Sequence, residues 1–259
     1  MPRYKLTIEY QGTRYSGWQI QKNARTVQGE ILAAVARSTG MTGFELYGAG
    51  RTDAGVHALR QVAHLDLTAP TKPEIFRIQL NDELPADIHV LAVEPADPRF
   101  HARHHAVARS YLYQISRRRT AFGKKLIWWV KEDLDLRSMR SAAVLFPGMK
   151  DCRSFAADEP EEKSAKVLIE RVQLKEAGDL ILIRIEGSHF LWKMVRRIVG
   201  VIVEAGKGKL PAAEISGFFK VKSDLPARLA APASGLFLER VYYEKDARLE
   251  DIAPVINIV

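Results

Sequence analysis

The chain has 259 residues, 47% of them hydrophobic, which is enough for one large domain or two ordinary ones with a buried core. Its single cysteine, Cys152, excludes an intrachain disulfide and a cysteine-based zinc site. No apolar run is long enough to span a membrane, because the best candidate, 190–203, is interrupted by Lys193, Arg196 and Arg197. The first residues enter a strand-like pattern directly, so a soluble cytoplasmic protein is expected.

The formal net charge is +8, and the positive charge is concentrated in one segment. Residues 99–125 contain eight Lys or Arg and no Asp or Glu, so this basic segment accounts for the whole excess of basic over acidic residues. It also contains Tyr111, Tyr113, Phe122 and three histidines. Basic residues mixed with aromatic ones are typical of proteins that contact phosphates and stack on bases. An anionic polymer is therefore favoured as the partner over a merely solvated face.

The first half of the chain predicts the order β-α-β-β-α-β, which is that of a ferredoxin-like unit. Alternation of apolar and polar residues predicts the strands. Helical spacing behind Thr26, and behind a capping box at 71–74, predicts the two helices. The expected strands are 3–10, 44–47, 61–67 and 88–93, and the expected helices are 27–39 and 73–84.

The second half predicts the same order of elements, without a residue-level repeat. Its expected strands are 104–116, 167–174, 180–185 and 235–243, and its expected helices are 136–146, 190–203 and 211–220. An acidic run at 158–162 lies in an expected exposed loop. We therefore expect an α+β fold of two ferredoxin-like, RRM-like domains with antiparallel sheets that form a basic cleft. The expected domains are 1–104 and 105–246, followed by a tail, 247–259.

The glycine-rich stretch at 48–58 contains several candidate functional residues close together in sequence. It reads G-A-G-R-T-D-A-G-V-H-A. Glycines permit tight turns and close backbone approach, so Arg51 and Asp53 are expected on a tight loop in front of a rigid strand. An ionised carboxylate in a sheltered loop can act as a general base or a covalent nucleophile. The alternative is that Asp53 only hydrogen-bonds its own backbone within the turn. No P-loop or dinucleotide-binding fingerprint is present.

This stretch closely resembles the signature of the TruA family of tRNA pseudouridine synthases. Four further stretches resemble motifs of that family, in the same order and across nearly the whole chain. They are G-x-x-Y-x-G-W-Q with R-T-V-Q at 12–28, F-H-A-R with R-S-Y-L-Y at 100–113, M-V-R-x-x-V-G at 194–200, and P-A-S-G-L-F-L at 232–238. The resemblance implies the fold, reaction and substrate class of that family.

Three catalytic residues follow from the resemblance. Asp53 falls on the family's catalytic aspartate. Tyr111 falls on the tyrosine that stacks on the target uracil, and its phenol can also move a proton; the alternative is a core tyrosine on a strand. Arg196 falls on the basic partner of the aspartate; the alternative is an arginine at the edge of an apolar stripe that extends to solvent.

Substrate-binding roles are implied for six residues. Arg51 resembles the residue that replaces the flipped nucleotide and steadies the loop, and Tyr111 binds the uracil. The others are His57, for which a structural role is the alternative, and Arg103, Arg109 and Leu236. The histidines of the basic segment, His101, His104 and His105, are not expected to bind a metal, because neighbours on a strand point to opposite faces.

The implied reaction isomerises uridine in the anticodon arm of tRNA, with tRNA positions 38, 39 and 40 expected, and needs no cofactor or metal. Asp53 would attack C1′ or C6 or assist glycal formation, and the residues do not decide which. The resemblance also implies a homodimer, with no membrane partner. The alternatives are a non-catalytic RNA-binding protein of RRM-like topology and another chemistry on the same scaffold. His104, His105 and the acidic run depart from the family pattern and leave the exact target positions open.

Overall fold

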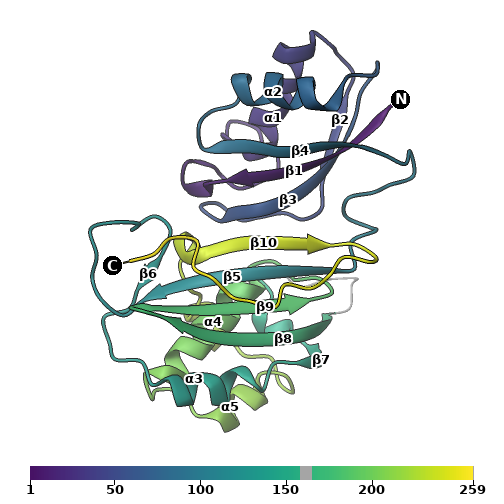
Figure 1. Cartoon of the computed structure of the whole chain (residues 1–259). Helices are drawn as coiled ribbons and strands as arrows, with labels where there is room; N and C mark the ends of the chain where they lie inside the picture. The colour runs from purple at the N-terminus through teal and green to yellow at the C-terminus, as the bar shows by residue number, and fades with distance from the viewer. Residues whose placement is uncertain (158–164, 259) are drawn as a thin grey trace. The chain divides into compact units, whose positions relative to one another are not determined.

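The protein is described by a computed structural model that covers residues 1–157 and 165–258. The chain divides into two units (Figure 1). The first comprises Met1–Val107 with Phe237–Ala247, and the second comprises Ala108–Leu236 with Arg248–Val259. The acidic run at 158–162 lies outside the described residues.

The first unit has the predicted β-α-β-β-α-β order, and its fold class, α+β with antiparallel strands, is confirmed. β1 lies between β4 and β3, and β2 pairs with β3, all antiparallel. The helices α1 and α2 lie together on one side of this sheet (Figure 1). The elements are β1 (Arg3–Tyr10), η1 (Gly12–Arg14), α1 (Val27–Thr39), β2 (Glu45–Gly48), β3 (His57–Asp66), α2 (Pro73–Glu83) and β4 (Ile88–Ala96).

Local sequence explains most of these boundaries. The apolar residues of β1 alternate with charged ones, and Tyr4, Leu6, Ile8 and Tyr10 are all buried. The Thr26 hydroxyl accepts a hydrogen bond from the Gly29 amide at the start of α1, as predicted. The predicted capping box of α2 is wrong, since Lys72 caps the helix without a side-chain hydrogen bond. Thr71 lies one residue before the cap, and its main-chain amide and carbonyl oxygen exchange hydrogen bonds with the Tyr4 hydroxyl.

The strand β10 (Leu236–Tyr242) is where the observed division differs from the expected one. Phe237 and Leu238 pair in parallel with His57 and Ala58 of β3, so the segment Phe237–Ala247 belongs to the first unit. β2 pairs with the other end of β3, between Ala63 and Asp66. A strand's partner is decided by contacts distant in sequence, which the local pattern of residues 235–243 does not contain. The division into independently folding domains stays a prediction.

The second unit contains an antiparallel sheet in the order β5-β9-β8-β7, with β6 pairing in parallel beside β5. The strand β7 and the helix α6 were not expected from the sequence. The strands are β5 (Ala108–Ser116), β6 (Trp128–Trp129), β7 (Gly148–Asp151), β8 (Lys166–Ala177) and β9 (Leu180–Gly187). The helices are α3 (Leu136–Ala143), η2 (Arg153–Phe155), α4 (Met194–Gly206), α5 (Ala212–Gly217), α6 (Leu225–Arg228) and η3 (Ala233–Gly235).

The helix α4 begins later than its apolar periodicity predicts. Lys193 has a left-handed backbone, with φ 60° and ψ 5°, and a helix cannot continue through that conformation. Phe190 and Leu191 therefore precede the helix, although they continue its apolar spacing. The rest of the predicted stripe is confirmed, because Ile198, Val199 and the apolar residues that follow are buried.

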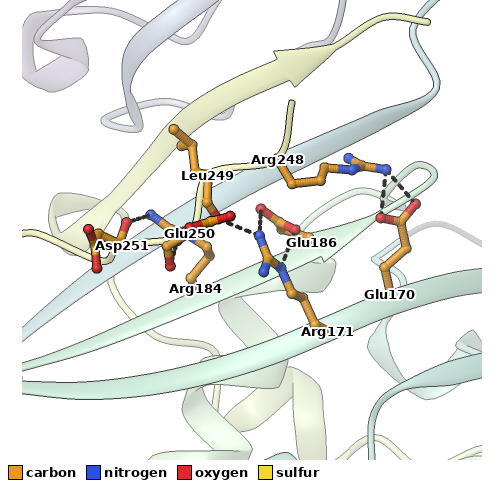
Figure 2. A network of polar contacts seen from close by, with 8 residues as sticks. All are labelled: Glu170, Arg171, Arg184, Glu186, Arg248, Leu249, Glu250 and Asp251. Atoms are coloured by element: carbon orange, nitrogen blue, oxygen red, sulfur yellow. Dashed lines mark hydrogen bonds and ion pairs between the residues drawn. The ribbon is translucent and has the colours of Figure 1, made fainter. Parts of the chain in front are cut away.

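The C-terminal segment from Arg248 is anchored on the second unit (Figure 2). Arg184 of β9, only 1% exposed, donates hydrogen bonds to the carbonyl oxygens of Leu249, Glu250 and Asp251 at 3.3, 3.4 and 2.6 Å. Arg171 of β8 forms a two-bond pair with the buried Glu186 and also donates to the Leu249 carbonyl oxygen. Because strand residues alternate between faces, these side chains mark one face of the sheet, and Tyr111, Ile183 and Ile185 lie on the other.

Candidate functional site

The Asp53 loop connects β2 to β3, and its backbone is held by the segment that follows β1. The Trp18 amide donates to the Thr52 carbonyl oxygen at 3.1 Å, and the Gly55 amide donates to the Tyr15 carbonyl oxygen at 3.3 Å. The Thr52 hydroxyl lies 2.8 Å from the buried Tyr10 hydroxyl. Asp53, which is half-buried, accepts a hydrogen bond at its carbonyl oxygen from the Val56 amide at 3.1 Å. Both sides of the aspartate are thereby fixed.

Two glycines let the chain after β1 approach this loop. Gly17 has φ +93°, and a Cβ on it would lie 2.5 Å from the Thr52 carbonyl oxygen and 3.1 Å from the Asp53 carbonyl carbon. A Cβ on Gly12 would lie 1.9 Å from the Val56 carbonyl oxygen. The motifs at 12–28 and 48–58 are therefore two halves of one structure. In the sequence, Gly12 and Gly17 have no role beyond their motif, and their only signal is that glycine permits such close contact.

His57 is 1% exposed, and its Nδ1 accepts a hydrogen bond from the Gly12 amide at 3.0 Å. An accepting Nδ1 places the ring proton of a neutral imidazole on Nε2. The ring packs against Phe237 at a centroid distance of 4.8 Å. His57 thus braces the start of β3 against the segment after β1, in line with the structural alternative; its contact with substrate stays a prediction. The exposed Arg51 donates from Nε to Gln19 Oε1 at 3.2 Å.

Arg103 is exposed and lies in the turn after β4. The neighbouring Ala102 amide donates to His64 Nδ1 at 3.2 Å, which places this turn beside the far part of β3. The Asp53 loop enters β3 at His57. Seven residues of strand span about 23 Å. The first unit therefore brings Arg51, Asp53 and His57 together and holds Arg103 away from them.

The histidines of the basic segment use ring nitrogens for backbone hydrogen bonds. His101 Nδ1 accepts from the amides of Arg103 and His104 at 3.2 and 3.3 Å, and His105 Nδ1 accepts from the His101 amide at 3.3 Å. Across residues 1–157 and 165–258, no group of three or more His, Cys, Asp or Glu is arranged to hold a metal ion. In the same part of the chain, no helix has the length and apolar character to cross a bilayer.

In the second unit, Tyr111 and Arg109 lie on β5 and both contact the segment that follows β9. Tyr111 is 9% exposed, and the edge of one ring faces Phe190 at a centroid distance of 5.2 Å and an angle of 87°. Arg109 is half-buried and donates from Nη1 to the Ser188 carbonyl oxygen at 2.8 Å. The structure thus brings these two predicted residues together around residues 188–190.

Arg196 lies in the first turn of α4 and is half-buried. Its Nε donates to the Ala231 carbonyl oxygen at 2.7 Å, and the Ala231 amide donates back to the Arg196 carbonyl oxygen at 2.9 Å. Close contact continues one turn later, because a Cβ on Gly200 would lie 1.8 Å from the Leu229 carbonyl oxygen. This double contact fixes the direction of the guanidinium.

Leu236 begins β10 and is buried behind the P-A-S-G motif. The Tyr113 hydroxyl donates to the Pro232 carbonyl oxygen at 2.8 Å, and a Cβ on Gly235 would meet the Tyr113 ring at 2.6 Å. Burial raises the pKa of Tyr113 well above its usual value, so this tyrosine is a packing residue and a hydrogen-bond donor. In the sequence, Tyr113 has no role beyond its motif.

Several cations of the basic segment are paired with acids from elsewhere in the chain. Arg117 contacts Glu176 at 3.3 Å, and Arg118 contacts Asp179 at 2.5 Å. Because both pairs are largely exposed, each contributes little to stability. They do reduce the local excess of positive charge, so the segment is less cationic than its sequence implies.

Comparison with known proteins identifies the family of this chain. A family model described as tRNA pseudouridine synthase matches residues 6–105 and 142–244, which include Asp53 and Arg196 but not Arg109 or Tyr111. The tRNA pseudouridine synthase A of Beijerinckia indica is 40% identical over 257 residues, covering 98% of this chain and 98% of that protein. The tRNA pseudouridine synthase A 1 of Protochlamydia amoebophila is 39% identical over 248 residues, covering 94% and 97%.

A solved structure titled "Crystal Structure of a Cbf5-Nop10-Gar1 Complex" overlaps 77% of this chain and 54% of that chain, with a TM-score of 0.34 and 9% identity. That likeness is too weak to support an argument. The family model and the near full-length relatives are sufficient to assign the family, and they agree with the five motifs. The chain belongs to the tRNA pseudouridine synthase family.

Proposed function

We propose that the protein isomerises uridine to pseudouridine in the anticodon arm of tRNA, with positions 38, 39 and 40 as targets. The N1–C1′ glycosidic bond breaks, the uracil rotates, and a C5–C1′ bond forms while C5 loses a proton and N1 gains one. Family membership supports the reaction, and the names of the relatives support tRNA as the substrate. The observation that carries the proposal is the Asp53 loop, whose family signature is held by backbone contacts on both sides of the aspartate.

Asp53 supplies the carboxylate that attacks the flipped nucleotide at C1′ or C6, or assists glycal formation. A rigid loop suits this role, because a reacting group must be held close to its productive geometry. Arg51, which is exposed beside Gln19, takes the place of the flipped nucleotide. A target base must leave its stack before a side chain can reach it. His57, which is buried, holds the start of β3 against the segment after β1. Its role in substrate binding is exerted through the Asp53 loop that precedes it.

Tyr111 and Arg196 act on the same uridine from the second unit. Tyr111 stacks on the uracil, and Phe190 supports its ring from the side. The family resemblance makes Arg196, whose Nε holds the Ala231 carbonyl oxygen, the basic partner of Asp53. Arg103 and Arg109 contact the RNA backbone, and Leu236 lines the base pocket.

The enzyme is a cytoplasmic homodimer that binds tRNA in a basic cleft. It uses neither a metal nor a small-molecule cofactor. The isomerisation involves no net redox change and no hydrolysis, so its atoms balance without a co-reactant. Activity that survives prolonged dialysis against EDTA is the expected result, and a loss restored by a divalent cation would contradict it. Sedimentation at working concentration tests the dimer.

A non-catalytic RNA-binding role remains the second candidate, because one observation favours it. The four N-terminal strands of the first unit lie in the order β4-β1-β3-β2, and RRM modules also use a four-stranded sheet. That candidate predicts tRNA binding without any product. Turnover separates the two functions, whereas binding does not.

The test uses tRNA labelled with tritium at C5 of uridine. Wild-type protein should release tritium from a tRNA with uridines at positions 38–40. It should release none from the same tRNA with cytidines there. Release from neither tRNA, despite salt-sensitive binding to both, would contradict the enzymatic proposal. Release from both tRNAs would contradict the proposed target positions.

A further inference from the structure

Trp192 is a large aromatic side chain that is left exposed just before the buried start of α4. Its side chain is 51% exposed, while Met194 and Val195, immediately after it, are 0% and 5% exposed. Phe190, two residues before it, packs on Tyr111. Single exposed apolar residues are common and need no explanation by themselves. Further observations on the same residue and its neighbour are therefore needed to assign it a role.

The backbone of this segment is fixed, so the exposure of Trp192 is not that of a loose loop. The Trp192 carbonyl oxygen accepts a hydrogen bond from the Ala157 amide at 3.0 Å. The Met194 amide donates to the Leu191 carbonyl oxygen at 3.1 Å, and the Arg197 amide donates to the Lys193 carbonyl oxygen at 3.1 Å. The indole is thus presented from a rigid position at the start of α4.

Lys193 adopts a backbone conformation that L-residues rarely take, with φ 60°. Glycine or asparagine would adopt it more easily, so the lysine side chain is kept at a position that disfavours it. Its ammonium nitrogen lies 4.6 Å from the centroid of the Trp192 ring. Sparsely populated backbone conformations cluster at functional sites, where the surrounding structure maintains them. The pair therefore presents an aromatic surface and a cation together.

We propose that Trp192 is a stacking platform for a nucleobase of the bound tRNA and that Lys193 contacts an adjacent phosphate. This inference rests on the proposed function and adds a binding residue to it. Stacking of a base on an aromatic ring tolerates any base identity, and a lysine beside it neutralises the backbone. In sequence, Trp192 lies between Phe190, which packs on Tyr111, and Arg196. It therefore positions the RNA near the residues proposed to act on the uridine.

The test compares the tRNA affinities of Trp192→Ala and Trp192→Phe with that of wild type. Loss of one stacked base should raise the Kd roughly 5- to 150-fold in Trp192→Ala. Trp192→Phe should restore most of the affinity, which a merely structural role would not require. Trp129→Ala is the matched control, because Trp129 is 40% exposed and has a guanidinium, that of Arg119, 5.9 Å from its ring. This control should bind tRNA like wild type.

Lys193→Gly provides an independent variant that does not risk the fold. Relief of the left-handed strain should keep or raise the Tm, while the loss of one phosphate contact should reduce the slope of log K against log salt by about one. An unchanged salt slope would overturn the lysine's role. A Trp192→Ala protein with wild-type Tm and wild-type Kd would overturn the stacking role.

Because these measurements report binding, their outcome is separate from that of the proposed function. Wild-type protein that forms no pseudouridine, while Trp192→Ala still weakens tRNA binding, would refute the reaction and support the platform. Wild-type turnover together with an unaffected Kd in Trp192→Ala would support the reaction and refute the platform. Quenching of tryptophan emission by tRNA should also be smaller in Trp192→Phe than in wild type if a base covers the indole.

Discussion

The Asp53 loop and the start of α4 each carry a proposed catalytic residue, and they are held in different ways. The loop depends on backbone lying against backbone, with Gly12 and Gly17 in contact with the carbonyl groups of the loop. Arg196 is held by a helix whose apolar face is buried, together with a side-chain hydrogen bond to Ala231. The loop has no hydrophobic stripe of its own, so its shape depends on the glycines.

This difference predicts how each region responds to substitution. Backbone contacts cannot relax by a change of rotamer, so an added methyl group must move the loop itself. A buried helix face tolerates exchange between apolar residues of similar size better than it tolerates new atoms. The largest effects on activity are therefore expected from small changes at glycines rather than from losses of single side-chain contacts.

Among the residues that hold the site in place rather than react, Gly17→Ala should have the largest effect. The new Cβ would meet the Thr52 carbonyl oxygen at 2.5 Å, and φ +93° is unfavourable for alanine. Strain and overpacking together should cost about 3 kcal/mol and remove most of the activity. Gly50→Ala, in the same loop, is the control, because a Cβ there has nothing within 4 Å. Chemical denaturation and tritium release measure both variants; equal behaviour of the two would show that backbone contact does not hold the loop.

Gly200→Ala should be next in size. Alanine normally stabilises a helix relative to glycine by roughly 1 kcal/mol, but here its Cβ would lie 1.8 Å from the Leu229 carbonyl oxygen. We expect a net loss of about 2 kcal/mol and a lower kcat, because α4 must shift away from Ala231. Gly217→Ala, with open space around its Cβ, should not be destabilised in the same way. A stabilised Gly200→Ala protein would contradict the close contact.

Arg184→Met should release the C-terminal segment without unfolding the second unit (Figure 2). The carbonyl oxygens of residues 249–251 lose their buried donors, at a cost of about 1.5 kcal/mol. Hydrogen exchange should therefore rise at residues 249–256 more than in β5. Arg248→Met, which removes the more exposed pair with Glu170, is the milder comparison. Unchanged exchange in Arg184→Met would show that the segment is held by other contacts.

His64 should give the smallest effect at neutral pH, because its contribution is a dependence of stability on pH that begins below about pH 6.5. Burial, with the nearby charges of Arg3 and His101, lowers the pKa of His64 from 6.5 to about 4. Between those values the unfolded chain binds a proton that the folded chain does not, so stability falls as the pH drops from 6.5 to 4, by up to about 1.4 kcal/mol per unit. His64→Gln should flatten this slope, whereas the exposed His89→Gln should not. An unchanged slope in His64→Gln would refute the assignment.

The sequence predicts the fold well wherever local periodicity decides it. β1, α1 and the β-α-β-β-α-β order follow from alternation and from the Thr26 cap. The predicted capping box of α2 fails because the helix begins one residue later than expected, with Lys72 and not Thr71 as its cap. The placement of β10 depends on pairing with β3, nearly two hundred residues earlier in the chain, and no local pattern encodes it. The late start of α4 depends on one backbone angle at Lys193.

For the site, the motifs locate Asp53, Tyr111 and Arg196, but they do not say what holds these residues. The contacts of Gly17 with Thr52 and of Arg196 with Ala231 join segments more than thirty residues apart in sequence. For His57 the motif suggests substrate contact. Its burial and its bond to the Gly12 amide instead give it a structural role at the start of β3. The sequence therefore predicts the reacting residues, but not the contacts that hold them in place.

The most direct test of the central claim is single-turnover tritium release by wild type, Asp53→Ala and Asp53→Asn, with tRNA affinity measured in parallel. We predict release by wild type, a fall of at least about 1,000-fold in both variants, and a Kd within about threefold of wild type, because the loop is held by its backbone. Release by Asp53→Ala at the wild-type rate, with equal tRNA binding, would contradict the assignment of Asp53 as the catalytic residue.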